Sequence, residues 1–169
     1  FWLVSFSRAA LLLMRGRIDE AESEAERSLR LGLEIGREYE APAFFAEQTG
    51  EIRRLRGRLG EVRDAVRRAV EDRMPDPAHV LLRFLTELDD EAAGPVLRRI
   101  VGEHGVIPPR NMAQRPALDN LALAASRQGA DDLLDPLYKA LEPHGDTFGH
   151  SAVAHHCGHH YLAHLAAAS

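Results

Sequence analysis

The amino-acid sequence predicts an all-α protein: an α-solenoid of about four helical hairpins followed by one C-terminal helix. Apolar residues recur at intervals of three and four along most of the chain, and no stretch alternates convincingly with a period of two. Four short polar segments align with one another without gaps: MRGRIDEA (14–21), LRGRLGEV (55–62), LTELDDEA (85–92) and SRQGADDL (126–133). Because a single helical hairpin cannot bury its apolar stripe alone, a repeated helix–turn–helix unit predicts stacked hairpins.

The four turn segments divide most of the chain into paired helices. Acidic residues follow each turn, where they stabilise the first turn of a helix, and Asp19, Asp90 and Asp131 are candidate N-caps. The predicted helices cover about residues 3–15 and 19–35, 42–57 and 60–73, 77–88 and 90–103, and 113–127 and 131–142, with a ninth over about 149–167. The predicted buried stripe of the second helix consists of Ala21, Ala25, Leu29 and Leu33.

We expect a single helical-repeat domain over residues 1–169. Its units are expected at about residues 1–36, 41–74, 77–104 and 113–144, with the final helix at 149–167. Proline and glycine gather between the units, as they do between packed elements in general. The chain begins without methionine and ends abruptly in AAAS, so we expect it to be a fragment of a larger protein.

The composition is that of an ordinary globular protein and narrows the choice of partners. A net charge of −5 argues against a large nucleic-acid footprint, since phosphate binding needs a basic surface. The single cysteine excludes an internal disulfide framework and indicates a reducing, cytoplasmic environment. No apolar run reaches the roughly 18 residues of a membrane span, and the opening FWLVSFSRAALLLM lacks the basic start of a signal peptide. We therefore expect no direct contact with nucleic acid or membrane.

The segments RGRIDEAESEAERSL and RGRLGEVRDAVRRAV resemble tetratricopeptide repeats. A glycine before the turn, a small residue four or five positions later and an alanine near the end of the second helix (Ala69) match that pattern. Gly50 stands where the family has a small residue in its first helix. The third unit departs from the pattern, with Glu87 in place of the turn glycine and Arg99 in place of the alanine, and the fourth has Leu121 in place of the first-helix small residue.

A narrower resemblance covers the last third of the chain. The residues IPPRNM (107–112) and LALAASRQGADDLLDPLYKALEPHGD (121–146) resemble the C-terminal tetratricopeptide-like region of bacterial, typically actinobacterial, ATPase-type regulators. These include adenylate-cyclase-linked and LuxR-type transcriptional activators. The resemblance implies a non-catalytic interaction or regulatory scaffold attached to a nucleotide-binding engine. The ATPase, cyclase and DNA-binding segments of that family are absent from these residues, so no functional residue is carried over.

The first helices of the hairpins line the inner face of such a solenoid and supply the predicted interaction face. The candidates are Phe44, Phe45, Gln48, Glu51, Arg83, Asn120 and Arg127, together with Phe6 and Ala10. The expected partner is a protein or peptide, including other domains of the same parent chain. The uncapped ends of the array also allow a homodimer.

The stretch AVAHHCGHHYLAH (152–164) places five histidines and the only cysteine within thirteen positions, and it raises the alternative of a zinc-binding sensor or enzyme. The candidate ligands are His155, His156, His159, His160 and His164. On a helix these rings fan around the axis, and each pair at i and i+4 supplies only two ligands, whereas zinc takes three or four from protein. We therefore predict a solvated helix with partly packed histidines, with metal binding and a pH-responsive contact as alternatives.

Other catalytic chemistry has little support in the sequence. No GxxxxGK[ST] or GxGxxG motif is present, and no HExxH motif supplies a general base between metal ligands. Residues 51–73 hold eight arginines against five acids, which is typical of a solvated helix face or of an electrostatic docking patch. We predict no catalytic residue, no cofactor and no enzymatic activity.

Overall fold

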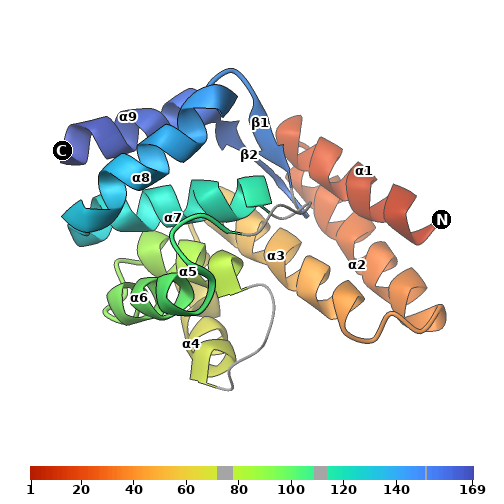
Figure 1. Cartoon of the computed structure of the whole chain (residues 1–169). Helices are drawn as coiled ribbons and strands as arrows, with labels where there is room; N and C mark the ends of the chain where they lie inside the picture. Colours follow the sequence, from red (N-terminus) through yellow and green to blue (C-terminus); the bar gives the residue numbers. More distant parts are fainter. Residues whose placement is uncertain (72–77, 109–113, 151) are drawn as a thin grey trace. The chain divides into compact units, whose positions relative to one another are not determined.

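The computed structural model describes residues 1–71, 78–108, 114–150 and 152–169, and it is mostly helical (Figure 1). The helices are α1 (Trp2–Met14), α2 (Ile18–Glu34), α3 (Glu40–Leu55), α4 (Arg63–Glu71), α5 (Ala78–Glu87), α6 (Ala93–His104), α7 (Gln114–Gln128), α8 (Asp131–Leu141) and α9 (Gly158–Ala168). The described residues also contain the short 3-10 helices η1 (Leu59–Val62) and η2 (Glu142–His144) and the strands β1 (Phe148–His150) and β2 (Ala154–Cys157). The all-α prediction is confirmed, and the first eight helices lie close to their expected positions.

The chain forms two compact units, which are described separately. Unit 1 consists of Phe1–Val62 together with Ala152–Ala154, and unit 2 contains residues 63–151 and 155–169. Three residues from late in the sequence thus belong to the N-terminal unit. No helix of the described ranges combines the length and the apolarity needed to cross a membrane.

Unit 1 is built from α1, α2 and α3, with α2 in contact with both of the others (Figure 1). The buried face of α2 consists of small residues: Ala21, Ala25, Ser28 and Gly32. At Gly32 an added Cβ would lie 2.3 Å from Ala41 Cβ, so only glycine permits this approach of α3. The predicted buried stripe is wrong at Leu33, which is exposed. Residues spaced by four each time drift around the helix axis, whereas residues spaced alternately by four and three stay on one face.

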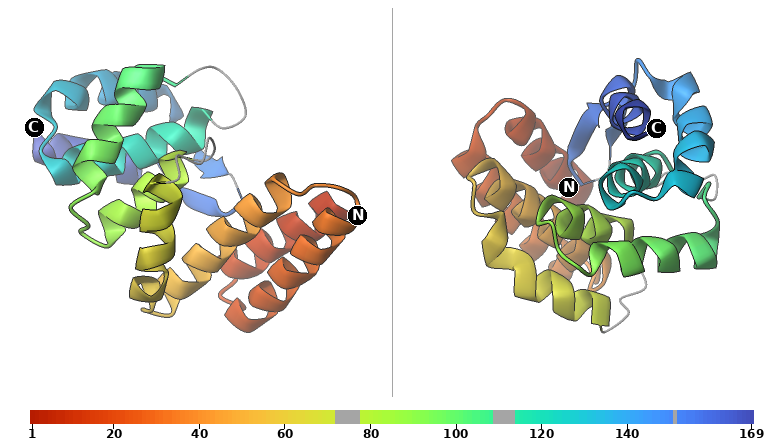
Figure 2. Two further views of the ribbon diagram at one scale, coloured as in Figure 1. Left: turned by 90° about the horizontal axis from the view of Figure 1, so that it is seen from below. Right: turned by 90° about the vertical axis from the view of Figure 1, so that its left-hand side faces the viewer.

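Unit 2 is arranged around α7, which contacts α5, α6, α8 and α9 (Figure 2). Every residue of α7 from Pro116 to Ala125 is buried. A helix that is buried on all sides carries no continuous polar face, and the residues of α7 that contact its neighbours include the polar pair Asp119 and Asn120.

The predicted ninth helix over 149–167 is wrong in its first half. Residues 148–150 and 154–157 form a two-stranded sheet instead, and α9 begins only at Gly158. The N–H of Gly158 donates to Thr147 O at 2.9 Å, and the N–H of His159 donates to Gly145 O at 3.0 Å. These bonds satisfy two donors that a helix start leaves unpaired, and they fix where α9 begins.

Five helix ends of the described residues share one geometry. A residue with positive φ follows each of α1, α2, α3, α5 and α7: Gly16 (70°), Gly36 (77°), Gly57 (68°), Asp89 (49°) and Gly129 (62°). In each case the N–H of the next residue donates to the carbonyl five positions earlier, as in Arg17 to Leu12 and Asp90 to Leu85. This is a Schellman-type ending. The gapless alignment is therefore corrected in two units, because Asp89 and Gly129, not Glu87 and Gln128, occupy the left-handed position.

Asp89→Gly is expected to raise the free energy of unfolding by about 0.5–1 kcal/mol, because a left-handed backbone is strained for an L-residue and relaxed for glycine. The carboxylate that is lost is 89% exposed and lies 4.0 Å from Arg127, so its ion pair contributes little. Urea unfolding at pH 7 measures the change. Gly57→Ala, the reverse exchange at the equivalent turn, should destabilise by about 1 kcal/mol. A loss of stability in Asp89→Gly would contradict the prediction.

Candidate functional site

Two buried polar side chains of α3 hold the main chain of Ala152 inside unit 1. Gln48 Nε2 donates to Ala152 O at 3.0 Å and to Phe6 O at 2.9 Å. The Ala152 N–H donates to Glu47 Oε2 at 3.3 Å. Both side chains are almost fully buried, Glu47 being 3% and Gln48 1% exposed. We call Glu47 and Gln48 the clamp, because together they satisfy both polar groups of one peptide residue.

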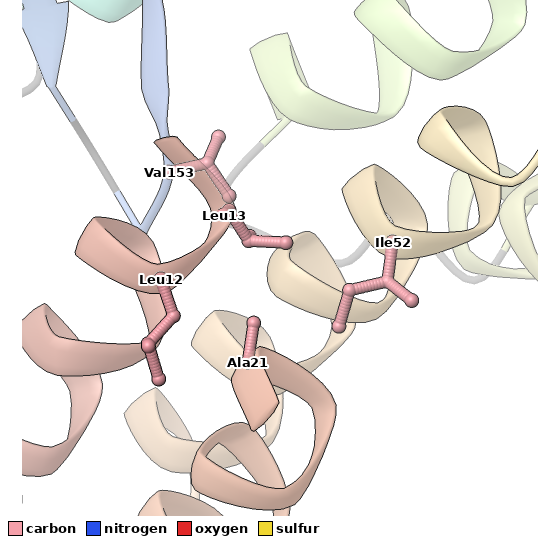
Figure 3. Packing of buried hydrophobic residues seen from close by; sticks show 5 residues of the cluster. All are labelled: Leu12, Leu13, Ala21, Ile52 and Val153. Atoms are coloured by element: carbon pink, nitrogen blue, oxygen red, sulfur yellow. The ribbon is translucent and has the colours of Figure 1, made fainter. Parts of the chain in front are cut away.

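The next residue, Val153, is anchored in the apolar core of unit 1. Its side chain is 1% exposed and belongs to a cluster with members from all three helices, seen close up in Figure 3: Leu12 and Leu13 of α1, Ala21 of α2 and Ile52 of α3. Ile18 packs against the same cluster. The 152–153 segment is thus bound through its main chain at one residue and through an aliphatic side chain at the next.

Aromatic stacking holds α1 against α3 beside the clamp. The Phe44 ring stacks on Phe6, with centroids 4.9 Å apart, and on Trp2, with centroids 5.8 Å apart. Phe44 and Gln48 are one helical turn apart on α3, so this stack brings Phe6 O within reach of the Gln48 amide. Gln48 is therefore positioned by the helical spacing from Phe44 and by the stacking of Phe44 on the aromatic rings of α1.

Four members of the predicted interaction face are buried: Gln48, Glu51, Arg83 and Asn120. In unit 1, Gln48 binds the 152–153 segment, and Glu51 pairs with Arg54 at 2.5 Å. Phe44 and Phe45 are half-buried, and Arg127 is exposed. Of the other candidates, Phe6 and Ala10 are buried as well.

Arg83 and Asn120 belong to a buried polar cluster of unit 2. Arg83 Nε donates to Glu87 Oε1 at 3.1 Å, and Asn120 Nδ2 lies 3.1 Å from His79 Nδ1. Burial, followed by the charge of the Asp119 carboxylate, raises the pKa of the Tyr161 hydroxyl to about 12. A phenol with this pKa stays protonated at neutral pH. The contact between Asn120 and His79 joins α7 to α5.

The histidines do not converge on one point. The rings of His156, His160 and His164 form a ladder, with centroids 4.2 and 4.7 Å apart, whereas His159 Nε2 lies 3.0 Å from Asp146 Oδ1. The side chain of His155 is outside the described part of the structure. Within that part, no three His, Cys, Asp or Glu side chains are grouped so as to hold a metal ion.

Partial burial lowers the pKa of His160, and the neighbouring cationic groups His156, His164 and Arg127 lower it further. Folding therefore favours the neutral ring, and the stability this gives is present above the ordinary value near 6.5 and lost as the pH falls through the lower folded-state pKa. We expect the melting temperature to fall less between pH 7.5 and pH 5 in His160→Gln than in the natural sequence. Thermal melts at both pH values measure this, and equal losses would contradict it.

The arginine-rich residues 51–73 are largely neutralised by acids of the same unit. In unit 1, Arg53 pairs with Glu22 at 2.9 Å, and Arg56 pairs with Glu22 at 2.6 Å. The Arg56 guanidinium holds the pKa of Glu22 below its ordinary value. In unit 2, Arg63 and Arg67 both pair with Asp90. Arg73 lies outside the described residues. These pairs leave little of the predicted docking patch.

The predicted interaction face includes Gln48 but not Glu47 or Val153. Glu47 precedes Gln48 on α3, where a charged residue is expected to face solvent, and Val153 was assigned to a helix. The protein is mostly helical, and in its N-terminal unit two side chains of α3 hold the main chain of its own residue Ala152. Among known proteins, no family model, no curated protein and no solved structure matches this chain. Main-chain hydrogen bonds and an apolar pocket are the two ingredients of peptide recognition.

Proposed function

We propose that this chain is a non-catalytic protein-interaction and regulatory scaffold, built as a tetratricopeptide-like solenoid. The same Schellman-type ending at α1, α3, α5 and α7, the first helix of each expected hairpin, supports a repeated hairpin as its structural unit. The resemblance over residues 107–146 supports placing it in a larger signalling or transcription-regulating ATPase. We place that protein in the cytoplasm, where a lone cysteine such as Cys157 is not drawn into disulfides.

The observation that carries the proposal is a concentration of exposed apolar side chains on the first hairpin. Of the twelve large hydrophobic residues that are exposed in the described part of the chain, eight lie within residues 1–39. They are Phe1, Leu3, Val4, Leu11, Met14, Leu33, Ile35 and Tyr39. Contiguous exposed apolar surface is the mark of a protein–protein interaction site.

The outer face of α1 is the centre of this surface. Leu3, Leu11 and Met14 are separated by eight and three residues, which places them on one side of the helix, with Val4 beside them. We call these four residues the α1 outer face. The opposite side of α1 is buried in unit 1, so this helix is apolar on both sides. A helix of this kind packs between two neighbours, and we propose that the second neighbour is the same helix of a second copy of this chain.

Sedimentation velocity over a hundredfold range of protein concentration tests this proposal. We expect reversible self-association, because two copies can cover the same apolar stripe in an isologous contact. The double variant Leu11→Glu with Met14→Glu should stay monomeric over the whole range. Ile107→Glu changes an exposed apolar residue of unit 2 and is the matched control that should associate like the natural sequence. A monomer at all concentrations in the natural sequence would count against the α1 outer face as a helix-binding surface.

A further inference from the structure

We propose that the clamp and the Val153 pocket form a binding site for a short segment of a partner protein, and that residues 152–153 are a built-in occupant that competes for it. The inference rests on the proposed function and names what the interaction module recognises. The partner segment carries a small residue followed by a β-branched aliphatic residue, the chemistry of Ala152 and Val153.

The segment is held through its main chain at one residue and through its side chain at the next. Glu47 accepts a hydrogen bond from the Ala152 N–H, and Gln48 donates one to the Ala152 carbonyl. These bonds read the main chain of the residue, whatever its side chain. The Ala152 side chain is fully buried, so only a small residue fits there, and the Val153 pocket selects an aliphatic residue. The site thus selects a small side chain at the first position and an aliphatic side chain at the second.

The polar character of the clamp distinguishes it from plain core packing. A buried carboxylate is costly unless it is hydrogen-bonded, and an apolar pair at 47 and 48 would fill the same space more cheaply. The Gln48 amide also reaches Phe6 O, so α1 and α3 keep the clamp in position around the segment. A preorganised pair of polar groups costs little to bring into place when a segment binds.

The occupant comes from far along the chain and is short. Gln48 and Ala152 are 104 residues apart in sequence, and the hydrogen bonds to the clamp come from the main chain of Ala152, with the Val153 side chain in the apolar cluster. Its strength comes from its being tethered, since a tethered ligand acts at a high effective concentration. A partner segment that adds contacts on either side of the same two residues can displace it.

Fluorescence polarisation with a labelled peptide of residues 149–155 (GHSAVAH) tests this on the full chain. The natural sequence should bind weakly, because its own segment occupies the site. Val153→Asp expels that segment and should bind the peptide at least about tenfold more tightly, since the tethered competitor is lost. Adding Gln48→Leu to Val153→Asp should remove that gain. Ile107→Asp, a matched change on unit 2, should bind like the natural sequence.

Val153→Ala keeps the main chain of the segment and removes only part of the anchoring side chain, so it should give a smaller gain in peptide affinity. It is the second test variant in case Val153→Asp does not fold. Equal affinity of the natural sequence, Val153→Ala and Val153→Asp would overturn the inference. Affinity that persists with Gln48→Leu would overturn it too. If these peptide-binding results are not obtained but the natural sequence still self-associates, only the inference of a built-in occupant is contradicted. If the natural sequence is a monomer but the variants bind the peptide as expected, only the proposal for the α1 outer face is contradicted.

Discussion

Replacing Gly158 with alanine is expected to lower the free energy of unfolding by about 2–3 kcal/mol, a large cost for a single methyl group. An added Cβ would lie 2.3 Å from His144 O and 2.8 Å from Gly145 Cα. Both are main-chain atoms, which cannot turn aside as a flexible side chain can. The methyl group would therefore push the start of α9 away from η2 and break the bonds from Gly158 N to Thr147 O and from His159 N to Gly145 O. Urea unfolding at pH 7 measures the loss.

Gly102→Ala is the matched control, because nothing lies within 4 Å of a Cβ at that position and φ there is not left-handed. Alanine in place of glycine within α6 should stabilise by up to about 1 kcal/mol through its higher helix propensity. A Gly158→Ala protein as stable as the natural one would show that α9 does not begin where the structure places it.

Removing the Asp90 carboxylate with Asp90→Ala is expected to cost about 2 kcal/mol, in line with hydrogen bonds to charged groups. Asp90 is buried, and its oxygens accept from Arg63 Nη1 at 2.6 Å, from Arg67 Nε at 2.9 Å and from the N–H of Ala92 at 3.1 Å. One side chain thus joins α4 to the start of α6. Asp135→Asn, which weakens an exposed pair with Lys139 on α8, should change stability very little.

The same carboxylate predicts a pH dependence with a definite sign. The Arg67 hydrogen bond, with those of Ala92 and Arg63, holds the pKa of Asp90 below its ordinary value of 3.8. The stability contributed by the ion pairs is therefore present above pH 4 and is lost as the pH falls through the folded-state pKa. Asp90→Asn keeps the acceptor for Ala92 but removes the charge. The difference in unfolding free energy between it and the natural sequence should shrink as the pH falls from 5 to 2, and a constant difference would refute the assignment.

Periodicity and turn chemistry were sufficient to predict the first eight helices. Glycine-containing turns such as those at Gly16 and Gly57 end a helix for a local reason, which a sequence displays directly. The third turn hid the same geometry because an aspartate, Asp89, adopts it. Aspartate tolerates the left-handed region better than most residues, and a gapless alignment anchored on glycine therefore placed this turn two residues too early.

The three N-cap predictions are wrong for a related reason. Asp90 accepts from the N–H of Ala92 at 3.1 Å, but Ala92 is itself the N-cap of α6, and no side chain caps that helix. Asp19 and Asp131 lie inside the first turns of α2 and α8, where no side-chain cap bond forms. There they still lie close to the positive end of the helix dipole. The sequence indicates that an acidic residue lies near the start of a helix. Which residue is the N-cap depends on where the main chain turns into the helix.

The segment around 152–157 was beyond prediction from local pattern. Its apolar and polar residues suit a helix, yet Val153 packs into the core of unit 1 and Ala152 is bound by the clamp. Long-range contacts therefore decide its conformation over local propensity. The candidate site could be predicted only in part for the same reason. Gln48 stands out as a polar residue of the first helix of its hairpin, but nothing near it in sequence indicates that its partner is Ala152.

The late entry of Val153 into unit 1 has a consequence for how the protein is made. Ile52 and Leu12 are synthesised early, but the last member of their cluster follows Ile52 by about a hundred residues. Chains emerge at roughly 5–20 residues per second, so a nascent N-terminal unit waits several seconds with its interior open. Closing so long a loop also slows the final step in the folding of this unit. During that interval the apolar side chains around the place of Val153 are exposed to water.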